Sequence, residues 1–292
     1  MKRDRIAIVG AGVVGTALAY LLKEKGYPLV GIASRRQESA QRAASLLPGG
    51  VQATVAPEEV VPGADLVFIT TSDSAIQEVC EAIANKKGFR PEQIVVHTSG
   101  ALPSTILNRA KESGAQIASV HPLQSFADVK EAVKTIPSSI FCLEGDREAI
   151  PPLIELVKTL GGKPISIDTQ HKPLYHAAAV VASNFLVTLS YLSYTLYETM
   201  GIPQEEAAQA LLPLIKGTVN NVEKLGPVRA LTGPISRGDG NVVRGHLEAL
   251  KELSPTFTDI YCSISRLTVE IGIKKGTLSL EGGEEILQIV GR

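Results

Sequence analysis

Two histidines follow apolar runs typical of buried strands, and each begins a short polar segment. His97 begins the segment His-Thr-Ser-Gly, in which Ser99 could bind a substrate, and His121 begins the segment His-Pro-Leu-Gln-Ser. Imidazole gains and loses a proton near neutral pH, so a histidine at a strand end could exchange a proton with a ligand. It could equally bond backbone groups and only end the strand. Because both strands should end at one edge, we take His121 as a candidate catalytic residue.

Three polar residues share one face of a helical segment that is otherwise apolar. They are Lys172, His176 and Asn184, separated by four and eight positions. Polar groups on an apolar helix are costly to bury unless they are paired or bind a ligand. We therefore expect Lys172 and His176 to act in catalysis and Asn184 to bind substrate. The alternatives are a buried hydrogen-bond network between two domains and, for Lys172, exposure at the helix start.

An arginine lies in a loop of turn-forming residues further along the chain. Arg237 belongs to the segment Leu-Thr-Gly-Pro-Ile-Ser-Arg-Gly-Asp, which ends at Asp239. A guanidinium group in such a loop could hold a substrate carboxylate. It could also pair with Asp239 and only fix the loop, and the sequence does not decide between the two.

A glycine-rich turn lies between the first apolar run and the first helical segment. It fits the pattern GxGxxG, directly after the run Ile6 to Val9. The first glycine permits the tight turn, the second lets the backbone approach a pyrophosphate, and the third lets the helix pack closely on the strand. The residues expected to bind a dinucleotide here are Gly10, Gly12, Val13, Val14 and Gly15.

The end of the second apolar run bears on which dinucleotide is bound. An NAD site would place an acidic residue there, but the chain has Ser34, Arg35 and Arg36, which favour the 2′-phosphate of NADP(H). After a later run, Thr71 and Ser72 could contact the nicotinamide half of the cofactor. The alternative, compatible with this role, is that Ser72 or its neighbour caps the next helix.

Short β-branched runs alternate with helical segments up to residue 168, and helices alone follow. This pattern predicts an α/β fold, a doubly wound parallel Rossmann sheet over residues 1–168, followed by an all-α substrate-binding and dimerisation domain over residues 169–292. The expected strands are 6–10, 29–34, 64–71, 93–97, 116–121, 138–143 and 164–168.

Composition excludes several other classes of protein. The formal net charge is −1 and aromatic residues make up 4%, so no basic or stacking surface for nucleic acid is expected. Three widely spaced cysteines suit reduced, buried thiols, and the histidines lack metal-ligand spacing. The charged N-terminus does not resemble a signal peptide. We therefore expect a cytoplasmic protein with no metal site.

The stretch from Ala177 to Met200 is long and apolar enough to raise the question of a membrane. Ser183, Asn184 and Glu198 are among the polar residues that interrupt it. We expect a core helix or a dimer helix there, and no membrane segment.

A resemblance to a family of Rossmann-like oxidoreductases, whose helical C-terminal domain has no known function, covers nearly the whole chain. It rests on the segments GAGVVG, SRR, HTSGAL, HPLQSF, HAAAVVASN and LTGPISRGD. The layout is similar to that of ketopantoate reductase, pyrroline-5-carboxylate reductase and 3-hydroxyisobutyrate dehydrogenase, with a C-terminal domain like that of 6-phosphogluconate dehydrogenase. The resemblance implies a homodimer formed through the helical domain, with the active site between the domains.

Parts of the chain also resemble other families. His121 and the following proline look like the His-Pro motif of prephenate dehydrogenases, in which the histidine meets the substrate hydroxyl. Hydroxyisobutyrate-type enzymes use a lysine and an asparagine four residues apart, for which Lys172 and Asn184 are the nearest matches, at a different spacing. The N-terminal half is similar to F420-dependent NADP reductases.

These observations together predict an NADP-dependent oxidoreductase. Its substrate would be a small polar metabolite with a carbonyl, alcohol or imine group, which the sequence does not identify. The alternatives are a protein that senses NADP(H) without turnover and an F420-dependent oxidoreductase.

Overall fold

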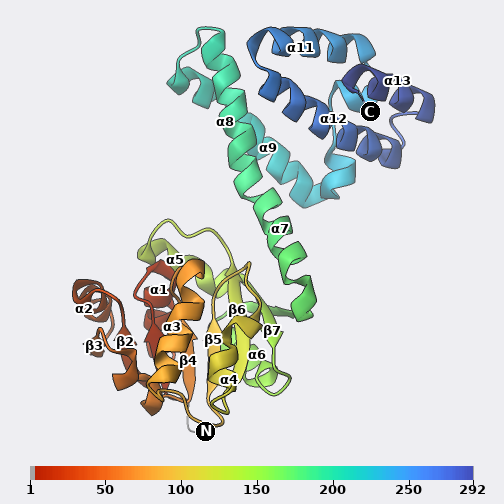
Figure 1. Cartoon of the computed structure of the whole chain (residues 1–292). Helices are drawn as coiled ribbons and strands as arrows, with labels where there is room; N and C mark the ends of the chain where they lie inside the picture. Colours follow the sequence, from red (N-terminus) through yellow and green to blue (C-terminus); the bar gives the residue numbers. More distant parts are fainter. Residues whose placement is uncertain (1–3, 292) are drawn as a thin grey trace. The chain divides into compact units, whose positions relative to one another are not determined.

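The computed structural model describes residues 4–291 and divides the chain into two compact units (Figure 1). Unit 1 extends to Phe185 and unit 2 begins at Leu186. The sequence placed the boundary after residue 168. The structure places it later, because Thr169, Lys172 and Tyr175 form hydrogen bonds with residues of the sheet in unit 1.

Unit 1 is built on an eight-stranded sheet with the order β3-β2-β1-β4-β5-β6-β7-β8. The strands are β1 (Ile6–Val9), β2 (Leu29–Ala33), β3 (Gln52–Thr54), β4 (Leu66–Ile69), β5 (Ile94–His97), β6 (Gln116–Leu123), β7 (Ile140–Gly145) and β8 (Lys163–Ser166). Strands β1 to β6 run parallel, so their carboxyl ends meet at one edge.

Two features of the sheet differ from the sequence-based expectation. β3 was not predicted, because a strand of three residues carries too little pattern to be recognised. β7 is antiparallel to β6 and pairs Ile140 with Leu123, so β7 starts at the edge where β6 ends. β8 follows the direction of β7. The predicted α/β fold is confirmed, with two strands at one side of the sheet reversed.

Helices cover both faces of the sheet (Figure 1). They are α1 (Val13–Glu24), α2 (Gln37–Ser45), α3 (Asp73–Asn85), α4 (Asn108–Lys111), α5 (Val129–Thr135) and α6 (Ile150–Thr159), with α7 (Lys172–Ala182) after the last strand. Alternate residues of β1 face opposite sides, as a pleated strand requires. Ile6 and Ile8 pack in one apolar cluster with Leu18 of α1, whereas Ala7 packs in a second cluster with Ile76 of α3.

Unit 2 is helical throughout the part that the structure describes. It contains α8 (Asn184–Thr199, from Leu186), α9 (Gln204–Ala230), α10 (Pro234–Arg237), α11 (Gly240–Leu253), α12 (Pro255–Lys275) and α13 (Leu280–Val290). α9 is interrupted at Gly226, whose φ of 75° suits glycine. A small apolar core joins α11, α12 and α13 around Val243, Val269 and Ile286.

The apolar stretch noted in the sequence forms a long helical segment. Thr169–Thr199 is long and apolar enough to span a membrane by length and composition alone, with a mean hydropathy of 1.4. α8 has no buried residue, and Val187 and Tyr191 are each about 70% exposed. The expectation of a core helix is therefore wrong for α8, whereas the expectation of a dimer helix stays a prediction.

Candidate functional site

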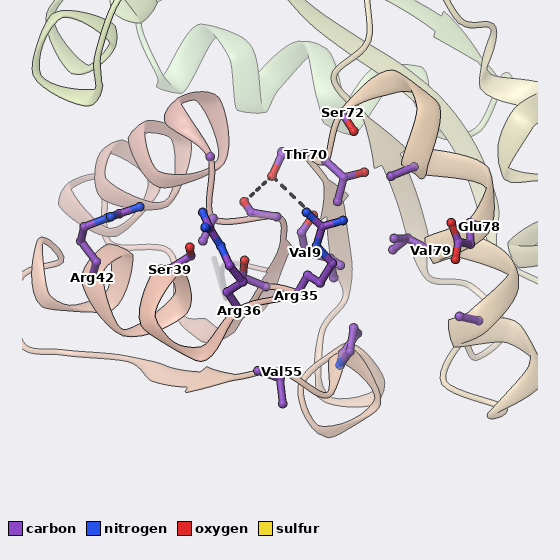
Figure 2. A pocket seen from close by; sticks show the side chains of 18 residues that line it. Val9, Arg35, Arg36, Ser39, Arg42, Val55, Thr70, Ser72, Glu78 and Val79 are labelled. Carbon is purple, nitrogen blue, oxygen red and sulfur yellow. Dashed lines mark hydrogen bonds between the residues drawn. The ribbon is translucent and has the colours of Figure 1, made fainter.

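A cavity of about 580 Å³ lies in unit 1 at the carboxyl ends of β1, β2 and β4 (Figure 2). This volume is within the range usual for small-molecule sites. Gly10 and Gly12 lie on one side of it, Ser34, Arg35 and Arg36 on another, and the segment after β4 closes it. The sheet thus places the glycine turn and the two arginines around one space.

The three glycines of the turn differ in what surrounds them. Gly10 has φ 125°, and a Cβ there would lie 2.6 Å from the carbonyl carbon of Thr70. A Cβ on Gly15 would lie 2.0 Å from the carbonyl oxygen of Gly10. Gly12 has no atom within 4 Å of its Cβ position and precedes the first residue of α1. The turn is therefore tightly packed at both ends and open in the middle, where the N-terminus of α1 could meet an anion.

Thr70 holds the glycine turn against the sheet, a role that the sequence did not indicate. Its hydroxyl donates a hydrogen bond of 2.7 Å to the carbonyl oxygen of Gly10. The next residue, Thr71, lines the cavity with a buried hydroxyl oxygen that has no protein partner within residues 4–291. Ser72 is the N-cap residue of α3, but its hydroxyl makes no cap hydrogen bond. An unsatisfied buried hydroxyl beside a cavity is suited to binding a ligand.

A third arginine joins the two predicted from the sequence. Arg42 of α2 lines the same cavity, beside Ser39, whose side chain is buried. Figure 2 shows Arg35, Arg36 and Arg42 with Ser39 on one side of the cavity, and Glu78 on the other. Within the described part of the chain, none of the three arginines forms an ion pair. This side of the cavity is therefore a cationic surface suited to an anion.

A second polar cluster lies on one face of the sheet, near the same edge. Ser119 and His121 alternate along β6, and Glu144 and Cys142 pair opposite them on β7. Residues that pair directly across two strands share a face, so all four side chains point the same way. His97 of β5 pairs with Ser119 and joins them.

Lys172, the first residue of α7, is fully buried against this cluster. Its ammonium group donates a hydrogen bond to the Ser119 hydroxyl. Burial lowers the pKa of Lys172, and the negative charge of Glu144 is the main influence that opposes this change. The expectation of an exposed Lys172 at the helix start is wrong.

Glu144 fastens the segment before α7 to the sheet. Its two carboxylate oxygens accept hydrogen bonds from the backbone N–H and the hydroxyl of Ser104, at 2.7 and 2.8 Å, and from the hydroxyl of Thr169, at 2.7 Å. Glu144 as a whole is 1% exposed. A buried carboxylate needs several donors, and these three, with Lys172 nearby, provide them.

His97 bonds backbone groups at the end of β5, which is the structural alternative that the sequence allowed for it. Its Nδ1 accepts a hydrogen bond from the backbone N–H of Ser99 at 3.1 Å, and its Nε2 lies 3.2 Å from the carbonyl oxygen of Pro103. Burial, followed by the charge of Lys172, lowers its pKa to about 4. Both ring nitrogens are used by backbone groups, so His97 shapes the turn after β5.

His121 and His176 meet at Gly100. A Cβ on Gly100 would lie 2.8 Å from Nε2 of His121 and 2.9 Å from Cδ2 of His176. Burial, followed by the charges of Lys172 and His176, lowers the pKa of His121 to about 4. Nδ1 of His121 lies 2.8 Å from the hydroxyl oxygen of Tyr175. The three predicted catalytic residues, His121, His176 and Lys172, therefore belong to one cluster.

Of the predicted substrate-binding residues, Ser99 and Asn184 belong to unit 1 and Arg237 to unit 2. The Ser99 hydroxyl accepts hydrogen bonds from the backbone N–H groups of Ala101 and Leu102, both at 3.1 Å, within its own turn. Asn184 begins α8, about two helical turns beyond His176 along the chain. In unit 2, Arg237 pairs with Asp239 at 2.8 Å, the alternative that the sequence allowed. Their roles toward a substrate stay predictions.

Comparison with known proteins agrees with this architecture. Residues 1–122 match the Rossmann-like domain family, and residues 139–268 match a domain of unknown function, DUF2520. The solved structure of protein TM1727 from Thermotoga maritima is 30% identical, with a TM-score of 0.74, and the match covers 92% of this chain and 99% of that one. The chain is a Rossmann-like DUF2520 protein. The predicted family is therefore confirmed.

Two further relatives of this DUF2520 protein bear on its chemistry. A Bacteroides fragilis protein assigned as an NADP oxidoreductase is 30% identical, with a TM-score of 0.71, and the match covers 91% of this chain and 97% of that one. Pyrroline-5-carboxylate reductase from Pseudomonas aeruginosa is 29% identical over 107 residues, which are 37% of this chain and 38% of that protein. The chain thus spans less than half the length of this curated relative.

Proposed function

We propose that this protein is an NADP-dependent oxidoreductase acting on a carbonyl, alcohol or imine group of a small polar metabolite. The observation that carries the proposal is the cavity of unit 1, where the glycine turn faces three arginines that have no ion-pair partner among residues 4–291. The name of the Bacteroides fragilis relative supports the choice of NADP.

The residues of the cavity fit a dinucleotide phosphate. The open position of Gly12 and the N-terminus of α1 would hold the pyrophosphate, and Ser34 with Arg35 would hold the 2′-phosphate. The unsatisfied hydroxyl of Thr71 would contact the nicotinamide half. When bound, the cofactor supplies or accepts the hydride.

The second polar cluster would bind and orient the substrate. β4, β5 and β6 end at the edge where open α/β sheets bind their ligands, and this edge carries Asp73, Gly100 and His121. His121, whose pKa is about 4, is neutral at pH 7 and could donate a hydrogen bond to the reacting group. Lys172 would act through Ser119, because its ammonium group is fully buried.

The test is oxidation of NADPH with a panel of 2-keto acids and cyclic imines, using the wild type and His121→Ala. We expect turnover with at least one panel member, and a loss of at least about 100-fold in kcat/KM for the variant, with NADPH binding retained. Binding of NADPH without turnover of any panel member would support the alternative, a protein that senses NADP(H).

We further propose that two copies of the chain associate through unit 2, and that the protein is cytoplasmic. Val187 and Tyr191 of α8 and Leu214 of α9 are each between 66% and 70% exposed, which is unusual for a monomer in water. A second copy would cover these side chains. Light scattering on the detergent-free protein should give twice the mass of 31.0 kDa. A monomer, or a protein that stays in solution only with detergent, would contradict the proposal.

A further inference from the structure

The hydroxyl group of Tyr175 in unit 1 is within hydrogen-bond distance of His121. The hydroxyl oxygen lies 2.8 Å from Nδ1 of His121. The rings of Tyr175 and His121 meet edge to face, with centroids 5.7 Å apart and planes at 83°. The Lys172 ammonium lies 5.8 Å from the centroid of the Tyr175 ring. These contacts fix the orientation of the His121 ring, and one of them occupies its Nδ1 atom.

One of the two atoms, the Tyr175 hydroxyl oxygen or Nδ1 of His121, must carry the proton of this hydrogen bond. A phenol O–H is a stronger acid than the N–H of a neutral imidazole, and an imidazole nitrogen with a free lone pair is a good acceptor. The Tyr175 O–H therefore donates to Nδ1 of His121. Nδ1 then carries no proton. Because His121 is neutral at pH 7, its single ring proton must be on Nε2.

The proton on Nε2 lies at the edge of the sheet where a ligand would bind. The Nε2 atom faces the bare Cα of Gly100, at a distance that leaves no room for a Cβ. Gly100 follows β5, and the carboxyl ends of parallel strands are the usual ligand-binding edge. The partner of Nδ1, the hydroxyl group of Tyr175, belongs to α7.

We infer that Tyr175 is a positioning residue that holds His121 in the neutral Nε2–H tautomer, so that His121 is a fixed hydrogen-bond donor to the oxygen or nitrogen of the substrate. The role toward substrate rests on the proposed oxidoreductase function. The tautomer itself does not, and it can be measured without a substrate.

The test begins with the tautomer of the wild type. Nitrogen-15 NMR of the full chain with labelled histidine shows which ring nitrogen of His121 carries the proton, and His121→Gln identifies the signal. We expect Nε2–H at pH 7. A proton on Nδ1 would overturn the inference, whatever any variant does.

Tyr175→Phe keeps the ring and removes the hydroxyl group. Without the donor, the ratio of tautomers should shift toward Nδ1–H by about 2- to 12-fold, the range that the net worth of one hydrogen bond gives. Diethylpyrocarbonate acylates only an unprotonated ring nitrogen, so acylation of His121, followed by mass spectrometry, should accelerate by the same factor. An unchanged ratio and an unchanged rate would overturn the inference.

Other histidines provide the controls within the same experiment. Exposed His171 reports the reagent concentration, and fully buried His97 becomes reactive only if the variant unfolds around it. If Tyr175→Phe unfolds in this way, the tautomer measured in the wild type is the test of the inference. A matched pair exists in unit 2, where Nδ1 of His246 lies 2.9 Å from the hydroxyl of Tyr261 and the rings meet at 87°. Tyr261→Phe should leave His121 unchanged.

Failure of the inference and failure of the proposed function are distinguishable. Calorimetric titration of the same Tyr175→Phe and wild-type samples with NADPH reports the cofactor site, which Tyr175 does not line. NADPH binding with an Nδ1–H tautomer would refute the positioning role alone. An Nε2–H tautomer without NADPH binding would refute the proposed function and leave the tautomer assignment standing.

Discussion

Acid should destabilise this protein between pH 6.5 and pH 4, because two histidines are held neutral by their surroundings. Burial, followed by the charge of Lys172, lowers the pKa of His97 and that of His121 to about 4 each. In the unfolded chain both bind a proton near pH 6.5. Below that pH the unfolded state takes up protons that the folded state does not, so the free energy of unfolding falls until the folded pKa is reached.

The size of the effect follows from the pKa values. At pH 4.5, about two units below the ordinary histidine pKa, each of the two residues should reduce the free energy of unfolding by about 2.4 kcal/mol relative to pH 7. His97→Asn removes one of these contributions, and the asparagine oxygen can still accept the hydrogen bond from the Ser99 backbone N–H. His171→Asn, at an exposed position, is the matched control.

Urea unfolding followed by circular dichroism, at pH 7 and pH 4.5, measures the effect. The loss of stability between the two pH values should be about 2.4 kcal/mol smaller in His97→Asn than in the wild type. It should be unchanged in His171→Asn. An equal loss in the wild type and in His97→Asn would refute the reasoning, because His97 would then bind its proton equally in both states.

Arg35→Asp should weaken NADPH at least about 10-fold more than NADH in calorimetric titration, since it replaces a cation by an anion beside the 2′-phosphate; equal losses would argue against NADP. Arg42→Ala should weaken NADPH about 10-fold, the worth of one charge-assisted hydrogen bond, and exposed Arg147→Ala is its control. Gly15→Ala should abolish nucleotide binding, because the new Cβ would meet the Gly10 carbonyl oxygen at 2.0 Å, and unaltered affinity would contradict the described turn. Glu144→Gln should lower the free energy of unfolding by about 3 kcal/mol, because Lys172 loses a counter-charge; a loss below about 1 kcal/mol in urea would contradict this.

The sequence predicted the parts of the proposed cofactor site that are local in the chain. The glycine turn lies between a strand and a helix, and Ser34 with Arg35 ends the next strand, so spacing alone placed them at one edge. Arg42 was missed although it is only seven residues beyond Arg35. Its place in the cavity depends on how α2 packs on the sheet, which no local pattern shows.

The second cluster was predicted only in part, because it depends on the register of two strands. Lys172, His176 and His121 were recognised as polar residues in apolar surroundings. Cys142 was not, since it lies opposite His121 only when β7 reverses and pairs with β6. Tyr175 was not, since its contact with His121 depends on where the sheet meets the start of α7. One signal was available: the polar residues Ser119 and His121 alternate with apolar ones in a buried strand, which places both on one face.

The most direct test of the central claim is a pair of calorimetric titrations of the wild-type protein, one with NADPH and one with NADH. The account predicts a dissociation constant for NADPH in the micromolar range or below, and NADH at least about 10-fold weaker, because the arginine surface has a 2′-phosphate to bind only in NADPH. Equal affinities, or no binding of either nucleotide, would contradict it.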